Sequence, residues 1–138
     1  MATCVGRAVL DAKAALVVAV TRDGSGSRLL SKYRPSVPVV VVTWNTAVAR
    51  HTAARFGQYP MLMTGDCPYP PRAAADQQAA PAEDLSRRLV DTGGAVDQAI
   101  FRAKGLGLFE SRFAAHPVVV MVEDADGRAS LSFTYTNC

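Results

Sequence analysis

Two serines lie where a strand is expected to give way to a helix, in the run Gly24-Ser25-Gly26-Ser27. A serine at such a junction can serve as a nucleophile, but the G-x-S-x-G nucleophile elbow is absent. The chain has two histidines, His51 and His116. We expect the first within a helix and the second near the amino end of the sheet, away from the serines. No catalytic triad is therefore predicted, and no catalytic residue.

A cysteine and four carboxylates offer two other kinds of chemistry. Cys67 lies in a proline-rich stretch, and the three cysteines of the chain show no C-x-x-C or metal-ligand spacing. A redox role stays open, but an ordinary loop thiol is favoured. Oxygen ligands for a divalent cation would come from Asp66, Glu123, Asp124 and Asp126. The D-A-D-G run at residues 124–127 lacks the closing glutamate of a calcium loop. We therefore predict a solvated turn, no metal and no cofactor.

Hydrophobic runs predict the strands that must position these side chains. Continuous β-branched runs are typical of strands buried on both faces, whereas alternation is typical of a strand with one covered face. The predicted strands are Ala15–Thr21, Val37–Thr43, Tyr59–Met63, Pro117–Val122 and the alternating Ala129–Tyr135. Helices are predicted at Ala8–Ala14, Arg28–Arg34, Ala47–Phe56 and from Ala82 to Gly105, with a break at Gly93–Gly94.

The order of these elements predicts a fold. Alternating helices and strands indicate a mostly parallel sheet with helices on both faces. We expect a three-layer α/β/α sandwich with a five-stranded mixed, mostly parallel sheet and the last strand antiparallel at the edge. In such sheets ligands bind beyond the carboxyl ends of the strands. Those ends are predicted at Thr21–Gly26, Thr43–Thr46, Thr64–Cys67 and Glu123–Arg128.

Length and composition exclude several classes of protein. The 138 residues fit one domain, 1–138, with a Pro/Ala-rich exposed loop at 64–81, and are too few for a (β/α)₈ barrel of roughly 200 residues or more. No apolar run approaches the roughly 20 residues that span a bilayer. The net charge of +3 comes with scattered arginines, so neither nucleic acid nor membrane is an expected partner. Free thiols and the lack of a leader sequence favour a cytoplasmic location.

Two segments resemble the C-terminal domain of pyruvate kinases. Thr21–Pro35, TRDGSGSRLLSKYRP, is similar to that family's T-x-S/T-G-R-S-A-x-x-V/L-A/S-x-Y-R-P. Val42–Leu62, VTWNTAVARHTAARFGQYPML, is similar to its VTxNxxxARxxxLxxGxxPxL. The resemblance covers nearly the whole chain. It implies a domain that binds a sugar-bisphosphate effector or builds subunit contacts, without the catalytic barrel and its activity.

In the family, the turn after the first strand supplies hydroxyls, amides and a cation to a phosphate. Thr21 and Gly24 are retained, while Asp23, Ser25 and Gly26 replace the first hydroxyl, the basic residue and the second hydroxyl. Arg22, Ser25 and Ser27 would partly compensate. The resemblance thus implies a candidate anion site of Thr21, Arg22, Gly24, Ser25, Gly26 and Ser27, with Trp44 and Arg128 beside it.

Two parts of that candidate site are acidic. A carboxylate at about 4 Å from a phosphate repels it by roughly 4 kcal/mol at an effective dielectric constant near 20. Asp23 introduces such a charge, and the last turn carries Glu123, Asp124 and Asp126 with only Arg128 as a cation. Asp23 or Ser25 can also cap the helix itself. We therefore expect loss of phosphate binding more than its retention.

The edge segment Ala129–Asn137 has neither proline nor lysine, and in the family the last strand pairs with a twofold mate. Such an edge invites pairing, so a homodimer or another binding partner is expected. The sequence favours a non-catalytic protein with a regulatory or interaction role. A sensor of a phosphorylated metabolite, binding at Thr21–Ser27, is the alternative, and a small enzyme using the same cleft is a weaker one.

Overall fold

The computed structural model describes residues 2–65, 82–108, 117–123 and 129–135. Its five strands form one sheet in the order β3-β2-β1-β4-β5. β1 is parallel to both β2 and β4, β2 is parallel to β3, and β5 is antiparallel to β4. The predicted mixed sheet with an antiparallel edge strand is thereby confirmed. The strands are β1 Leu16–Val20, β2 Val39–Thr43, β3 Gln58–Leu62, β4 Pro117–Glu123 and β5 Ala129–Tyr135.

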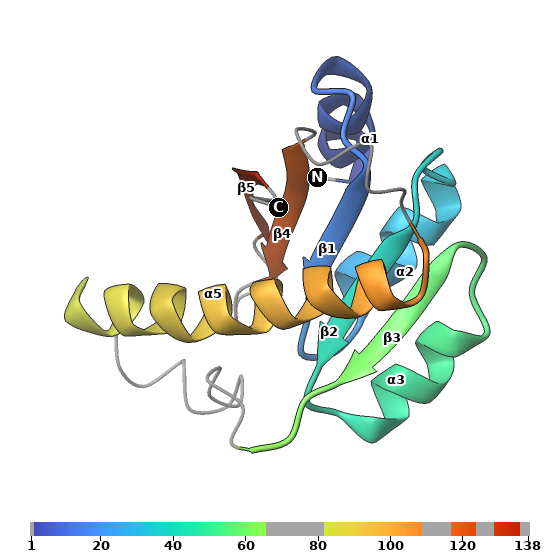
Figure 1. Cartoon of the computed structure of the whole chain (residues 1–138). Coiled ribbons are helices and arrows are strands. Elements are labelled where there is room, and N and C mark those ends of the chain that lie inside the picture. Colours follow the sequence, from blue (N-terminus) through green and yellow to red (C-terminus); the bar gives the residue numbers. More distant parts are fainter. Residues whose placement is uncertain (1, 66–81, 109–116, 124–128, 136–138) are drawn as a thin grey trace.

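Helices cover both faces of this sheet (Figure 1). On one side α5 packs on alternate side chains of β1, with Val96, Ala99 and Ile100 buried against the sheet. On the other side α1 and α2 contribute Val5, Val9 and Leu30 to a second core. These two cores account for the predicted three-layer arrangement. The helices are α1 Ala2–Asp11, α2 Ser25–Tyr33, α3 Thr46–Ala53 and α5 Ala82–Gly105.

The central strands are buried because layers of helix lie on both of their faces. Every residue of β1 and β2 is buried, which explains their continuous β-branched sequences. β5 differs because its residues alternate. Leu131 and Phe133 stand opposite Met121 and Val119 of β4, on the face that carries α1 and α2, whereas Ser132 stands on the α5 face. The predicted alternation of the edge strand is therefore present.

The predicted break at Gly93–Gly94 is wrong, since α5 runs without interruption from Ala82 to Gly105. Each glycine costs a helix about 1 kcal/mol relative to alanine, which weakens a helix but does not forbid it. Both glycines are exposed, while Thr92 and Ala95 on either side of them are buried. Burial of the flanking helix face offsets the cost of the two glycines.

The bounds of two other helices differ from the prediction. α2 begins at Ser25 rather than Arg28, and α3 ends at Ala53 rather than Phe56. Asn45 is the N-cap of α3, because its Oδ1 accepts a hydrogen bond from the Ala47 N–H at 2.9 Å. Gly57 has a left-handed φ of +67°, but it lies in the turn before β3, beyond the helix end.

Candidate functional site

The sheet reverses its winding between β1 and β4. From β1 the chain proceeds to β2 and β3 on one side, whereas β4 and β5 lie on the other. In open α/β sheets the crevice beyond the carboxyl ends at such a switch point is the usual ligand position. Val20 of β1 is in register with Val122 of β4. The residues that follow them, Thr21 and Glu123, therefore meet at this switch point.

The carboxylate of Glu123 fills the switch point. Its side chain is 5% exposed, and the Thr21 hydroxyl donates a hydrogen bond to Oε2 at 2.5 Å. The Ser25 hydroxyl donates to Oε1. The Gly26 N–H lies 3.1 and 3.2 Å from the two oxygens. Two hydroxyls and a helix N-terminal amide thus bind a carboxylate supplied by β4.

The turn between β1 and α2 explains why these donors converge. Gly24 adopts a left-handed φ of +78°, which reverses the chain into the helix. Its N–H donates to Thr21 Oγ1 at 2.9 Å, and the Ser25 N–H donates to Asp23 Oδ1 at 2.9 Å. The first turn of α2 is therefore hydrogen-bonded within the chain, through Asp23 as well as Glu123. With these acceptors in place α2 begins at Ser25, so Ser25–Ser27 are helical although the predicted helix starts only at Arg28.

A cation lies behind the same turn. Arg55, which follows α3, donates from Nη1 to the Ser27 hydroxyl at 2.7 Å and to the Gly24 carbonyl at 3.4 Å. The amide of Gln58 donates to the Ser27 carbonyl at 2.6 Å. Ser27 is fully buried and thus turns toward α3 and away from Glu123. Sequence reasoning missed Arg55 and Gln58, since nothing in the local pattern connects the end of α3 with α2.

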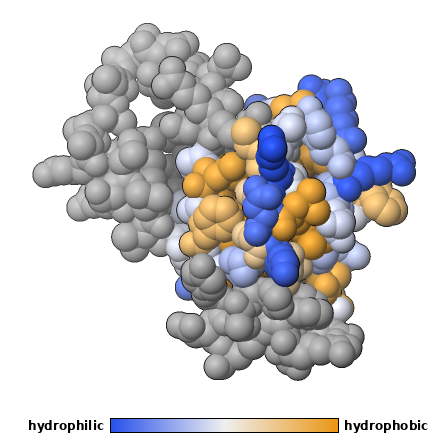
Figure 2. All heavy atoms as spheres, turned by 90° about the horizontal axis from the view of Figure 1, so that it is seen from above, coloured by the Kyte–Doolittle hydropathy of each residue, from blue (hydrophilic) through white to orange (hydrophobic). Residues whose placement is uncertain are grey.

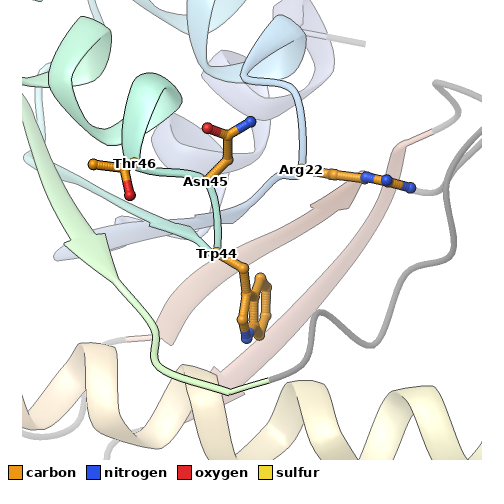
Figure 3. A pocket seen from close by; sticks show the side chains of 4 residues that line it. All are labelled: Arg22, Trp44, Asn45 and Thr46. Carbon is orange, nitrogen blue, oxygen red and sulfur yellow. The ribbon is translucent and has the colours of Figure 1, made fainter.

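A separate pocket of about 350 Å³ lies beyond the ends of β1 and β2, lined by Arg22, Trp44, Asn45 and Thr46. In Figure 3 the Trp44 ring extends toward α5, while the Arg22 side chain extends away from α3. Trp44 is half-buried and packs against the core beneath α5. The pocket therefore combines an aromatic face with a cation.

The predicted site residues fall into two groups. Thr21, Gly24, Ser25 and Gly26 form the turn around Glu123, joined by Ser27 on its far side, whereas Arg22 and Trp44 line the pocket. Predictions that concern six further residues lie outside the described part of the chain. These are Asp66, Cys67, His116, Asp124, Asp126 and Arg128.

Beyond this turn, the structure places two further residues with reactive side chains and bears on the metal and membrane predictions. His51 is exposed on α3 and Cys4 is exposed on α1. Within the described ranges no cluster of three or more His, Cys, Asp or Glu residues has the geometry of a metal site. In the same part of the chain, no helix has both the length and the hydrophobicity to span a membrane.

An open, mostly parallel sheet whose winding reverses at a polar turn defines a class of α/β domains, in which this edge is the usual position of a ligand where one binds. The chain belongs to one family of that class. The family model described as "Pyruvate kinase, alpha/beta domain" matches residues 1–101, which confirms the resemblance of Thr21–Pro35 and Val42–Leu62.

Curated relatives match a part of this domain. Pyruvate kinase of Clostridium acetobutylicum is 40% identical over 62 residues, 45% of this chain and 13% of that protein. Pyruvate kinase of Chlamydia pneumoniae is 48% identical over 52 residues, 38% of this chain and 10% of the relative. Pyruvate kinase 2 of Saccharomyces cerevisiae is 35% identical over 82 residues, 59% of this chain and 14% of the relative. The chain thus spans only a small part of each relative's length.

Proposed function

We propose that this domain is non-catalytic and has a regulatory or protein-interaction role, in which two copies associate through β5. The family match is to an α/β domain. The polar residues at the switch point support a non-catalytic role, because Thr21 and Ser25 are hydrogen-bonded to a buried carboxylate that also binds a main-chain amide. The observation that carries the interaction role is the edge strand itself.

The main chain of β5 alternates between β4 and the outer edge of the sheet. The Pro117 carbonyl accepts a hydrogen bond from the Ala15 N–H at 3.3 Å, so this carbonyl faces β1. Because main-chain groups alternate in direction along a strand, the N–H and C=O groups of Val118, Val120 and Val122 face β5. Their partners are Thr134, Ser132 and Ser130. The outward-facing N–H and C=O groups of β5 therefore belong to Leu131, Phe133 and Tyr135.

The side chain of Phe133 strengthens this case. It is 52% exposed and lies on β5, the outermost strand of the described sheet (Figure 1). A second β5 would extend the sheet by main-chain hydrogen bonds and cover apolar surface. By contrast, the end of the molecule where the parallel strands begin shows hydrophobic areas divided by a band of hydrophilic residues (Figure 2). Among the described residues in that view, no continuous apolar area is visible.

Substitution of Phe133 tests the association. We expect the wild-type protein to be a dimer and Phe133→Arg to be a monomer, because two guanidinium groups would be brought together at the paired edge. Light scattering coupled to size-exclusion chromatography measures both masses. Phe101→Arg is the matched control. It makes the same chemical change at a residue that is 80% exposed on α5, away from β5. A monomeric wild type at every accessible concentration would contradict the proposal.

The pocket beside α3 favours a second candidate, a sensor of a phosphorylated metabolite. Arg22 offers a charge for a phosphate and Trp44 offers a face for an apolar group. This candidate does not need the Glu123 carboxylate to move, because the pocket lies on the β2 side of β1.

The single tryptophan of the chain is a built-in reporter for this candidate. Titration with fructose bisphosphates and with nucleotides is expected to change the Trp44 fluorescence with a saturating dependence. Arg22→Ala is expected to weaken the affinity about tenfold or more, as loss of one charge-assisted contact does. Arg28→Ala, on the exposed side of α2, is the control and should leave the affinity unchanged. Unaltered fluorescence at millimolar ligand would dismiss the sensor.

A further inference from the structure

The three residues around Glu123 have the chemistry of an oxyanion site. We call Thr21, Ser25 and Gly26 the cradle. Each directs a donor at the same carboxylate: two hydroxyls and one main-chain N–H. The amide belongs to the first turn of α2, where the helix dipole and the unpaired N–H groups favour a negative charge. The cradle also lies at the switch point of the sheet, between β1 and β4.

We propose that Glu123 is a built-in occupant of this cradle, so that the native domain excludes external phosphate and removal of the carboxylate admits it. The occupant shows which ligand class the cradle takes, because Glu123 places both carboxylate oxygens against its donors. The inference concerns a closed anion site, and it does not depend on association through β5.

Packing around Gly26 explains how the Glu123 carboxylate reaches the amide of the helix. A Cβ added at Gly26 would lie 2.8 Å from Met121 Cε and 3.1 Å from Glu123 Oε2. Both of those side chains are at least 95% buried, with Met121 1% and Glu123 5% exposed. The absence of a side chain at Gly26 is therefore what lets the carboxylate approach the helix amide.

Tethering gives the internal carboxylate a second advantage over a free anion. Glu123 is the last residue of β4, and β4 is held in register by β1 on one side and by β5 on the other. An occupant held on the scaffold has a high effective concentration at the cradle. A free phosphate would have to displace this carboxylate or share the cradle with a like charge, and either requirement opposes binding.

The test compares inorganic phosphate binding by calorimetry in the wild type, Glu123→Ala and Glu123→Gln. We expect Glu123→Ala to bind phosphate at least about tenfold more tightly than the wild type. Glu123→Gln should gain little, because its amide still occupies the space although the charge is gone. Asp97→Asn is the control for net charge, since Asp97 is exposed on α5. Equal phosphate affinity in Glu123→Ala and Asp97→Asn would overturn the inference.

A second variant assigns any binding to the cradle. Adding Ser25→Ala to Glu123→Ala removes one of the donors and should reduce the gain in phosphate affinity severalfold. A gain that survives this double substitution unchanged would place the phosphate elsewhere and overturn the inference.

A measurement on the native protein keeps the inference testable should Glu123→Ala fail to fold. The Gly26 amide resonance of the wild type, followed by ¹H–¹⁵N spectroscopy, is expected to stay in place as inorganic phosphate is added, while resonances of exposed basic residues shift with the ionic environment. A saturating phosphate-dependent shift of Gly26 would show an accessible cradle and would overturn the inference.

Discussion

Replacing Glu123 with alanine is expected to lower the free energy of unfolding by about 2–4 kcal/mol. The substitution removes the acceptor of the Thr21 and Ser25 hydroxyls and of the Gly26 amide. Hydrogen bonds to a charged group contribute about 1.5–3 kcal/mol, and a buried donor left without a partner adds a penalty. Thr21 is fully buried and Gly26 is buried, so water cannot easily replace the lost carboxylate. Urea denaturation measures the change.

Two companion variants separate the charge from the shape of the side chain. Glu123→Gln retains an acceptor of similar size and should lose about half as much stability. Asp97→Ala removes a carboxylate from the exposed face of α5 and should change the stability by less than about 0.5 kcal/mol. A loss below about 1 kcal/mol in Glu123→Ala would mean that the carboxylate does not hold α2 to β4.

Substituting Gly24 by alanine is expected to destabilise the domain by a comparable amount, about 2–4 kcal/mol. Two physical effects add here. A left-handed backbone conformation costs an alanine about 1 kcal/mol more than a glycine. In addition, a Cβ at position 24 would lie 2.9 Å from Val48 Cγ1 of α3, and forcing apart well-packed elements typically costs about 1–3 kcal/mol. Thermal and urea unfolding report the sum.

Gly57 provides the matched control for this substitution. It has a similar φ, +67°, but an added Cβ would meet no atom within 4 Å. Gly57→Ala should therefore cost only the backbone term, about 1 kcal/mol. The difference between the two variants isolates the contact between the β1–α2 turn and α3. Equal losses would mean that Val48 moves aside and that this contact does not constrain the turn.

Much of the fold could be predicted because its signals are local. The runs around Val17–Val20 and Val39–Val42 carry the β-branched pattern of doubly covered strands, and Asn45 caps α3 by a bond that spans two residues. The prediction of a helix break at Gly93–Gly94 was wrong because the deciding interactions there are not local. Residue preference opposed the helix there, but burial of Ala95, Val96 and Ala99 comes from tertiary packing that a local pattern does not contain.

The candidate site was only partly accessible to the same reasoning. Asp23 or Ser25 is predicted to cap α2, whereas the N-cap residue is Gly24. The local part of that prediction is present, since Asp23 accepts a hydrogen bond from the Ser25 N–H two residues away. Glu123 was predicted to belong to a solvated acidic turn, yet it is buried against Thr21 and Ser25, about a hundred positions earlier in the chain. A carboxylate near a helix N-terminus either repels an anion or replaces it. Only the register of β1 with β4 places the Glu123 carboxylate against the first turn of α2.

The position of β1 has a consequence for how this domain is made. Its partner on one side, β2, follows within about twenty residues, whereas its partner on the other, β4, begins at Pro117. During synthesis β1, which is fully buried in the folded domain, therefore leaves the ribosome with one edge unpaired for some hundred residues. Over that interval the free edge of β1 is available for non-native strand pairing. Once β4 has been synthesised it pairs with β1, and its Glu123 accepts the hydrogen bond from the first turn of α2.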